Sequence, residues 1–188
     1  HYILTALDSI AWLLNLRGND ILFTPLNLAY VIITPNRKIE LFINKEKIQD
    51  IQNYLSKFSN LHSLESIYNF IKHLPIHEKI GIDKIRTPFI FEKTCREHSL
   101  NIIYFEDPCI YPKAQKNIVE LEGARRANIR DGVSITKFLY WLKNKIDINK
   151  TDEIEAAQKL LSLREKNNLF YSPSFETITA FGKHAALP

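Results

Sequence analysis

Glycine and cysteine are scarce in this chain, and their scarcity excludes two kinds of site. Only five glycines occur among 188 residues, and they never reach the GxGxxG or GxxxxGK spacing of a phosphate-binding loop. The two cysteines, Cys95 and Cys109, have neither the CxxC spacing of zinc sites nor the density of a secreted disulfide scaffold. We therefore expect no nucleotide-binding loop and two free thiols in a reducing cytosol.

Blocks of one charge and long apolar runs are also missing. The 25 Lys and Arg and the 21 Asp and Glu residues leave a formal net charge of +4, and they are interspersed, unlike the basic tail of a nucleic-acid-binding or membrane-binding protein. No apolar run reaches the roughly 18 residues that span a bilayer, and no signal peptide opens the chain. The sequence predicts a folded, cytoplasmic protein with no nucleic-acid and no membrane partner. Because it starts at His1 and not at Met, we expect an excised segment.

Strand and helix signals alternate over residues 1–110. Short apolar runs predict strands at 2–6, 28–33, 39–43, 79–82 and 101–105. Helical spacing predicts helices at about 8–15, 48–58, 64–74 and 87–95, the first capped by Asp8 or Ser9 and the last by Thr87. Pro35 and Asn36, between the second and third strands, favour a hairpin. The fold class expected is α/β, with a mixed sheet flanked by helices.

Pro108 and Pro112 bracket the expected domain boundary, which gives domains at 1–110 and 111–188. Helical spacing then predicts a long helix over 113–146, ended by residues 147–150. Thr151 is the expected N-cap of one more helix, and 170–181 has the polar alternation of a strand. An apolar stripe on the long helix would be exposed, so we expect self-association or partial disorder beyond about residue 112.

Two further patterns have the spacing of a possible site, but each favours a structural role. His73 and His77 have the spacing of two metal ligands on one helical face, but Pro75 lies between them and ends the helix, which favours surface histidines. The polar loop at 15–20 is interpreted as a turn held by its own side chains, with Gly18 at positive φ.

The charged and serine-containing stretches also favour structural roles. Glu122 precedes Arg125 and Arg126 at the spacing of helix-stabilising ion pairs. Ser172 and Ser174 lack the GxSxG elbow of a nucleophilic serine.

Three blocks of sequence, taken in order, resemble one enzyme family. They are TALDSIAWLLNLRGND at 5–20, EGARRANIRDG at 122–132, and SFETI at 174–178 followed by Gly182. Together they are similar to the middle domain and the start of the catalytic domain of the cytosolic, three-domain Xaa-Pro aminopeptidases. The resemblance implies a creatinase-like middle domain at 1–110 and the truncated start of a pita-bread metallopeptidase domain at 111–188.

The activity that the resemblance implies is removal of the N-terminal residue that precedes proline, so the expected partners are peptides with proline at the second position. The family uses two divalent metal ions, usually manganese, to activate a bridging water. A cytoplasmic homo-oligomer, a dimer, is the implied assembly. The metal ligands are expected beyond this chain, so the segment alone is expected to be inactive.

Only Phe181 and Gly182 carry over from the family as residues beside the substrate pocket. The family's active-site histidine is expected directly after Pro188, and His184 takes the place of an asparagine in that motif. Lys183 and Ala185 also depart from the family pattern, which bears on the fine shape of the pocket. Two alternatives remain: a non-catalytic pita-bread relative that binds peptides or proteins, and an assembly module made of the middle domain alone.

Overall fold

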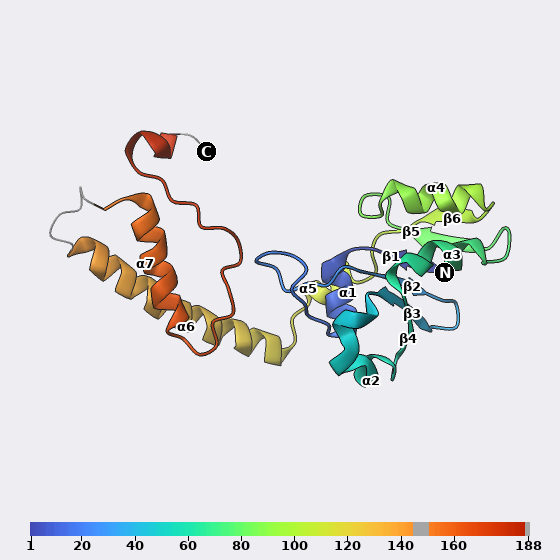
Figure 1. The fold of residues 1–188 in the computed structure, drawn as a ribbon, viewed down its shortest axis with the longest axis horizontal. Coiled ribbons are helices and arrows are strands. Elements are labelled where there is room, and N and C mark those ends of the chain that lie inside the picture. The colour runs from blue at the N-terminus through green and yellow to red at the C-terminus, as the bar shows by residue number, and fades with distance from the viewer. Residues whose placement is uncertain (145–150, 187–188) are drawn as a thin grey trace. The chain divides into compact units, whose positions relative to one another are not determined.

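A computed structural model describes residues 1–144 and 151–186 of the chain (Figure 1). Its contacts divide the chain into two compact units, His1–Gln115 and Lys116–Pro188. The boundary predicted from the sequence, between 110 and 111, falls slightly earlier. No helix among the described residues is both long enough and apolar enough to cross a membrane.

The first unit is built on a six-stranded mixed sheet. Its strands are β1 (Tyr2–Leu4), β2 (Ala29–Ile33), β3 (Ile39–Ile43), β4 (Ser59–His62), β5 (Lys79–Ile82) and β6 (Asn101–Tyr104). Their order across the sheet is β4-β3-β2-β1-β5-β6. Antiparallel pairing joins β1 to β2 and β2 to β3, whereas β3–β4, β1–β5 and β5–β6 are parallel. The predicted α/β class with a mixed sheet is confirmed.

Helices cover both faces of this sheet (Figure 1). Successive strand residues point to opposite faces, so Ile3 and Leu4 of β1 enter different cores. The Leu4 core includes residues of α1 (Leu7–Leu14) and α2 (Gln52–Leu55). The Ile3 core includes residues of α3 (Ile67–Lys72) and α4 (Phe89–Glu97).

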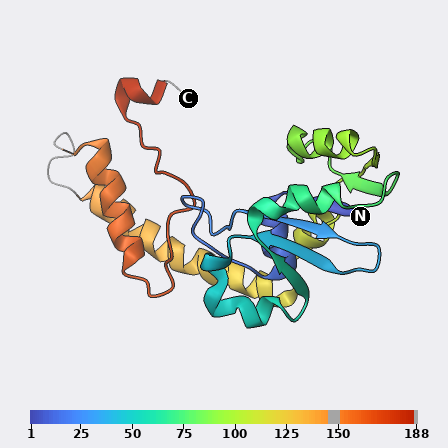
Figure 2. The same ribbon diagram turned by 45° about the vertical axis from the view of Figure 1, so that its right-hand side comes forward.

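The predicted hairpin is present as β2 and β3, the two blue strands joined by a turn in Figure 2. Ile33 lies opposite Ile39, and the Thr34 and Lys38 backbones close the turn between them. Arg37 has a positive φ of 62° in this turn. The turn residues therefore set the register locally, which is why sequence alone could find it.

Three predicted N-caps are wrong. The N-cap of α1 is Ala6 and makes no side-chain cap bond, and Asp8 lies inside the first turn of that helix. Ser9 is not a cap either, because its hydroxyl donates to Asp107. Pro88, and not Thr87, precedes α4.

The segments predicted as helices at 48–58 and 64–74 are partly 3₁₀ and end earlier than predicted. The first begins at Lys45 and consists of η1 (Lys45–Ile51) and α2, and the second consists of η2 (Leu64–Ser66) and α3. Strand β4, which begins at Ser59, was not predicted. It pairs in parallel with β3 along the edge of the sheet, and its sequence SNLH has only one strongly apolar residue.

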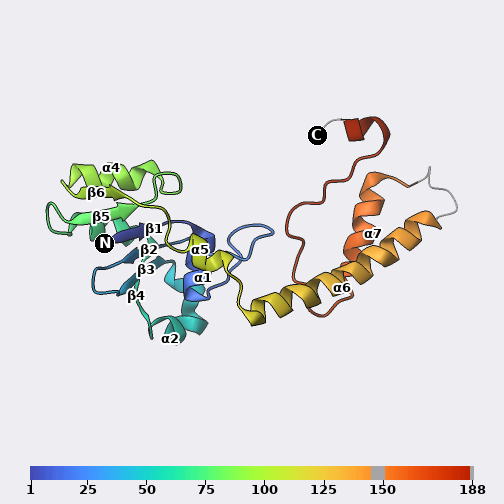
Figure 3. The same ribbon diagram turned by 180° about the vertical axis from the view of Figure 1, so that it is seen from behind.

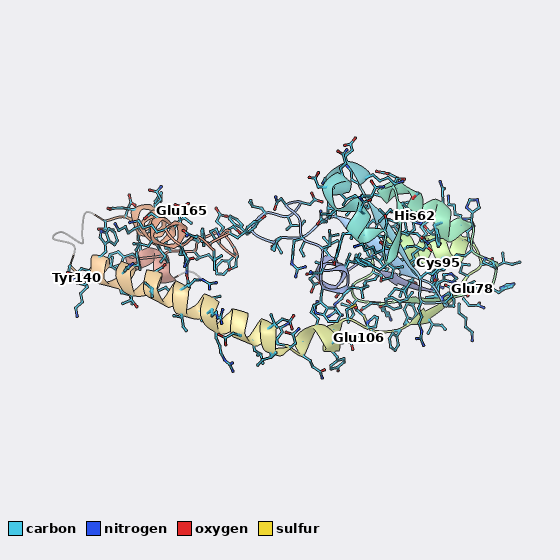
Figure 4. All side chains as sticks on the ribbon, turned by 90° about the horizontal axis from the view of Figure 1, so that it is seen from below. His62, Glu78, Cys95, Glu106, Tyr140 and Glu165 are labelled. Carbon is cyan, nitrogen blue, oxygen red and sulfur yellow. The ribbon has the colours of Figure 1, made fainter. Side chains whose placement is uncertain are left out.

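Both cysteines are free and buried. Cys95 lies in α4, inside the first unit (Figure 4), and Cys109 directly precedes α5 (Ile110–Ala114). Burial raises the pKa of each thiol to about 11. These thiols are therefore protonated near neutral pH and poorly suited to nucleophilic chemistry.

The second unit contains two main helices, α6 (Ile118–Lys143) and α7 (Glu153–Glu165), and a short 3₁₀ turn, η4 (Gly182–Ala186). The helix predicted over 113–146 is thus divided, because Asn117 forms a capping box with Glu120 and starts a new helix. Its predicted end at 147–150 lies outside the described residues. Ser134 is the one buried residue of α6, so the predicted exposed stripe is present.

Two more predictions for this unit are wrong. The N-cap of α7 is Asp152, whose side chain accepts a hydrogen bond from the Glu155 N–H, and not Thr151. Residues 170–181 form no strand. All the named strands of the described chain belong to the sheet of the first unit, so this segment has no partner strand to complete a ladder.

Candidate functional site

The residues that the sequence places beside a substrate pocket lie at the N-terminus of α7. Glu153 is the first residue of that helix, and its position is fixed by the Asp152 cap. Its Oε1 accepts a hydrogen bond from the Phe181 N–H at 2.7 Å. The same carboxylate contacts His184 Nδ1, at 3.0 Å from Oε1 and 3.2 Å from Oε2. One carboxylate therefore holds two points of the segment that contains Phe181 and Gly182.

A backbone contact adds to this attachment. Thr179 Oγ1 donates to the Glu153 carbonyl oxygen at 3.1 Å. Beyond Phe181, Gly182 has a φ of +57° and begins η4. This is the left-handed conformation that glycine adopts without a steric penalty. The chain thus turns directly after the residue that Glu153 holds.

The electrostatics of Glu153 favour its charged form. The Phe181 N–H and then the His184 imidazole hold the pKa of Glu153 below its usual value. A carboxylate in the first turn of a helix is also stabilised by the helix dipole. Glu153 is therefore an anion near neutral pH.

A cavity of about 450 Å³ lies beside these contacts. The Thr151 hydroxyl, on its wall, is buried without a hydrogen-bond partner in the protein. The other lining residues come from the end of α6, the start of α7 and the segment before Gly182: Leu142, Asp152, Glu153, Ala156, Ile178, Thr179, Ala180 and Phe181. The wall is mixed, because apolar side chains line it together with Glu153.

The described residues do not provide a dinuclear metal centre. No group of three or more His, Cys, Asp or Glu side chains among them is arranged to hold a metal ion. The His73 and His77 pair is also separated structurally, because His73 ends α3 and its Nδ1 contacts the Asn69 carbonyl at 2.6 Å. His77 lies in the following turn with a φ of 64°.

A second polar cluster, in the first unit, was not predicted from the sequence. Asp83 follows β5 and Asp107 follows β6, so both lie at the carboxyl ends of parallel strands. Asp83 accepts hydrogen bonds from the N–H groups of Ile85, Arg86 and Asp107 and from the Arg86 guanidinium. Burial raises the pKa of Asp83, but these bonds outweigh that effect and the pKa lies below its usual value.

Asp107 connects this cluster to α1 and α5. It accepts a hydrogen bond from Ser9 Oγ at 2.5 Å and another from the Cys109 N–H at 2.8 Å. Lys113 of α5 binds Asp8 and lies 3.2 Å from Ser9 Oγ. Figure 3 shows α5 beside α1. Since Ser9 is 1% exposed and donates its proton to a carboxylate, this serine–lysine pair is structural and cannot reach a substrate.

The loop at 15–20 is held by local bonds, as predicted, although Gly18 has a different role. Arg17 donates to the Ala11 carbonyl at 2.8 Å, and Asp20 accepts a bond from the Leu28 N–H at 2.8 Å. Gly18 is not among the residues with positive φ. Instead, a Cβ at Gly18 would lie 2.2 Å from the Asn27 side chain, so close packing requires glycine there.

The ion pairs predicted for the charged stretch of α6 are present. Glu122 pairs with Arg126 at 2.8 Å and with Arg125 at 3.9 Å, and all three side chains are well exposed. A different charged pair joins the two helices, because Arg164 of α7 binds both oxygens of Asp131 on α6 at 2.6 and 3.0 Å.

Comparison with known proteins decides the family. Residues 1–120 match the family described as Creatinase/Prolidase N-terminal domain. The chain belongs to this family. The match covers the whole sheet-containing unit and the first turn of α6.

Relatives of this creatinase/prolidase chain extend the likeness into the second unit. A protein named "Probable Xaa-Pro aminopeptidase P" from Paracoccidioides brasiliensis (strain Pb03) is 36% identical over 200 residues, which covers 99% of this chain and 32% of that protein. The protein of the same name from Coccidioides posadasii (strain C735) is 36% identical over 196 residues, covering 98% of this chain and 30% of its own length. The chain thus spans about a third of each relative.

A solved structure has the same fold over the whole chain. It is the X-prolyl aminopeptidase from Caenorhabditis elegans, described as a cytosolic enzyme with a di-nuclear active site. The TM-score is 0.88 at 29% identity, covering 100% of this chain and 32% of that one. The sequence resemblance to the Xaa-Pro aminopeptidases is therefore confirmed at the level of family and fold.

The sequence resemblance predicts Phe181 and Gly182 beside the pocket, and it gives no role to Glu153. The sequence signal for Glu153 was its position next to Asp152 at a helix N-terminus. Asp152 caps the helix, and Glu153 binds elsewhere. Nothing local in the sequence indicates that its partner lies 28 residues away.

Proposed function

We propose that this chain is part of a metal-dependent Xaa-Pro aminopeptidase, which removes the N-terminal residue preceding proline from peptides. The observation that carries the proposal is the match to the C. elegans X-prolyl aminopeptidase over the full length of this chain. The 36% identity to proteins named as Xaa-Pro aminopeptidases supports it.

The proposed enzyme uses two divalent metal ions, manganese by resemblance to the family, and works in the cytoplasm as a homodimer. The description of the C. elegans enzyme as cytosolic and di-nuclear supports two metal ions and a cytoplasmic location. Two such metals supply a hydroxide near neutral pH and polarise the scissile carbonyl. The described residues of this chain fit no such centre, so we assign the metal ligands to other parts of the protein and expect residues 1–188 alone to be inactive.

The part assigned to this chain is to shape one side of the substrate pocket. Phe181 and Gly182 are the residues proposed beside the peptide. Phe181 is 79% exposed, while its backbone N–H is bound by Glu153. An exposed aromatic ring on an anchored backbone is suited to contact an apolar part of a substrate.

Full-length protein should be assayed for release of the first residue from an Xaa-Pro peptide. We expect release that stops after treatment with a chelator and returns with added manganese, and no release by residues 1–188 alone. A folded full-length protein that binds proline peptides but never cleaves them would contradict the proposal and favour a peptide-binding module.

A further inference from the structure

We propose that Glu153 is a positioning residue that holds the substrate-facing segment from Thr179 to His184 in its working conformation. This inference rests on the proposed function for its catalytic consequence. Its structural part, that one carboxylate orders this segment, stands on the contacts alone.

Glu153 reaches the segment at three separate points. Its two side-chain contacts are with the Phe181 N–H and the His184 imidazole, and its carbonyl oxygen accepts the bond from Thr179. These partners are 26 to 31 residues away along the chain. Contacts at both ends of a short segment define its path, whereas a single contact would leave it free to pivot.

The segment needs such an anchor because it is irregular. Residues 171–181 belong to no helix or strand, so their N–H groups have no partners from a regular helix or sheet ladder. The Phe181 N–H obtains a charged acceptor at 2.7 Å, and hydrogen bonds to a charged acceptor are among the stronger ones.

The anchor itself is rigid. Glu153 lies in the first turn of a 13-residue helix whose N-cap, Asp152, accepts a bond from the Glu155 N–H at 2.6 Å. Arg164, near the other end of α7, is bound to Asp131 of α6 through two hydrogen bonds. A side chain on a capped and braced helix positions its partner better than one on a loop.

The contact between Glu153 and His184 depends on a residue that departs from the family pattern. In the resembling motif its place is taken by asparagine, and here the imidazole Nδ1 lies within 3.2 Å of both oxygens of Glu153. The carboxylate is thus shared between the backbone before Gly182 and a side chain after it. The left-handed turn at Gly182 lies between these two points.

The test compares Glu153→Ala and Glu153→Gln in the full-length protein. Alanine removes every acceptor of the side chain, whereas glutamine keeps one oxygen that can still accept the Phe181 N–H. Glu165→Gln is the matched control, because Glu165 is an exposed glutamate at the other end of the same helix (Figure 4).

The first readout is hydrogen–deuterium exchange of the peptide covering 178–184. We expect faster exchange there in Glu153→Ala, an intermediate rate in Glu153→Gln, no change in the control, and no change in α6 for any variant. Unchanged exchange at 178–184 in Glu153→Ala would overturn the inference whether or not the protein is an aminopeptidase. If Glu153→Ala fails to fold, the two single variants Glu153→Gln and His184→Ala are measured in its place. Unchanged exchange at 178–184 in both of them would also overturn the inference.

The second readout is kinetic. A displaced pocket residue leaves the bound substrate poorly aligned, so kcat should fall by about 10- to 100-fold in Glu153→Ala, with a smaller change in KM. The kcat of Glu153→Gln should lie between those of Glu153→Ala and the wild type. If the wild-type protein has no activity, the proposed function fails while the exchange result still decides the role of Glu153. Faster exchange with unchanged kcat and KM would overturn the catalytic consequence.

Discussion

At the scale of single residues, Asp83 accepts several hydrogen bonds within the first unit. Asp83→Asn replaces a buried carboxylate, which only accepts hydrogen bonds, by an amide. The NH₂ group of that amide then faces N–H groups that are themselves donors. We expect the free energy of unfolding to fall by about 1–3 kcal/mol, measured by urea denaturation. The control is Asp50→Asn, an exposed aspartate for which no measurable loss is expected.

The same carboxylate predicts a pH dependence. The pKa of Asp83 is lowered in the folded state, so its contribution is present above the unfolded value of about 3.9 and is lost as the pH falls through the folded pKa. The stability difference between wild type and Asp83→Asn should therefore be largest near neutral pH and shrink in acid below about pH 4. A constant difference across that range would contradict a charged role for Asp83.

Two glycines should respond oppositely to alanine. At Gly18 the added Cβ would lie 2.2 Å from the buried Asn27 side chain, and overpacking of this kind costs about 1–3 kcal/mol. At Gly123, in α6, nothing lies within 4 Å, so alanine should stabilise the helix by about 0.5–1 kcal/mol. Thermal unfolding of both variants checks the pair, and a stabilised Gly18→Ala would show that Asn27 moves aside freely.

At the scale of elements, the start of α6 depends on Asn117. Its side chain accepts a bond from the Glu120 N–H at 2.9 Å, and Glu120 accepts one from the Asn117 N–H at 2.9 Å. Asn117→Ala should therefore cost about 0.5–2 kcal/mol and reduce helical circular dichroism. Asn128→Ala, in the exposed middle of α6, serves as the control and should not destabilise. Equal effects would mean that the capping box contributes nothing.

Elements defined by nearby residues could be predicted from the sequence, and those defined by distant ones could not. The hairpin of β2 and β3 follows from the turn between Thr34 and Lys38. By contrast, 170–181 has strand-like alternation but no partner strand, and β4 has a polar sequence but a partner in β3. Ser9 was mistaken for a cap because its true acceptor, Asp107, is 98 residues away.

The candidate site divides in the same way. The resemblance, which consecutive residues carry, predicts Phe181 and Gly182 beside the pocket. Glu153 and the polar cluster of Asp83 and Asp107 depend on contacts made across the fold, between segments that no local pattern connects. Their roles follow only from the three-dimensional arrangement of the helices and strands.

At the scale of the whole molecule, the exposed side of α6 predicts association. Ile118, Val119 and Ile129 are 72%, 76% and 69% exposed, and apolar side chains gathered on one helix favour contact with another protein surface. Tyr140 of the same helix is also exposed (Figure 4). We expect residues 1–188 to sediment as a concentration-dependent oligomer.

Charge on that surface should weaken the association. Val119→Glu combined with Ile129→Glu should shift the chain toward monomer, while Lys137→Glu, on the same helix, should have a smaller effect because it removes no apolar contact. A wild-type chain that stays monomeric over a wide range of concentrations would contradict the prediction.

The three-residue strand β1 has a consequence for how the first unit folds. It lies between β2 and β5, so it separates a part made from residues 29–62 from a part made from residues 79–104. Each part is compact in sequence, but their union requires His1 and Tyr2 to meet Lys79 and Gly81. Such distant pairing is slow to form. We therefore expect the two halves to gain structure early and to join late. A defect in β1 would then produce a protein with two folded halves that are not joined into one sheet.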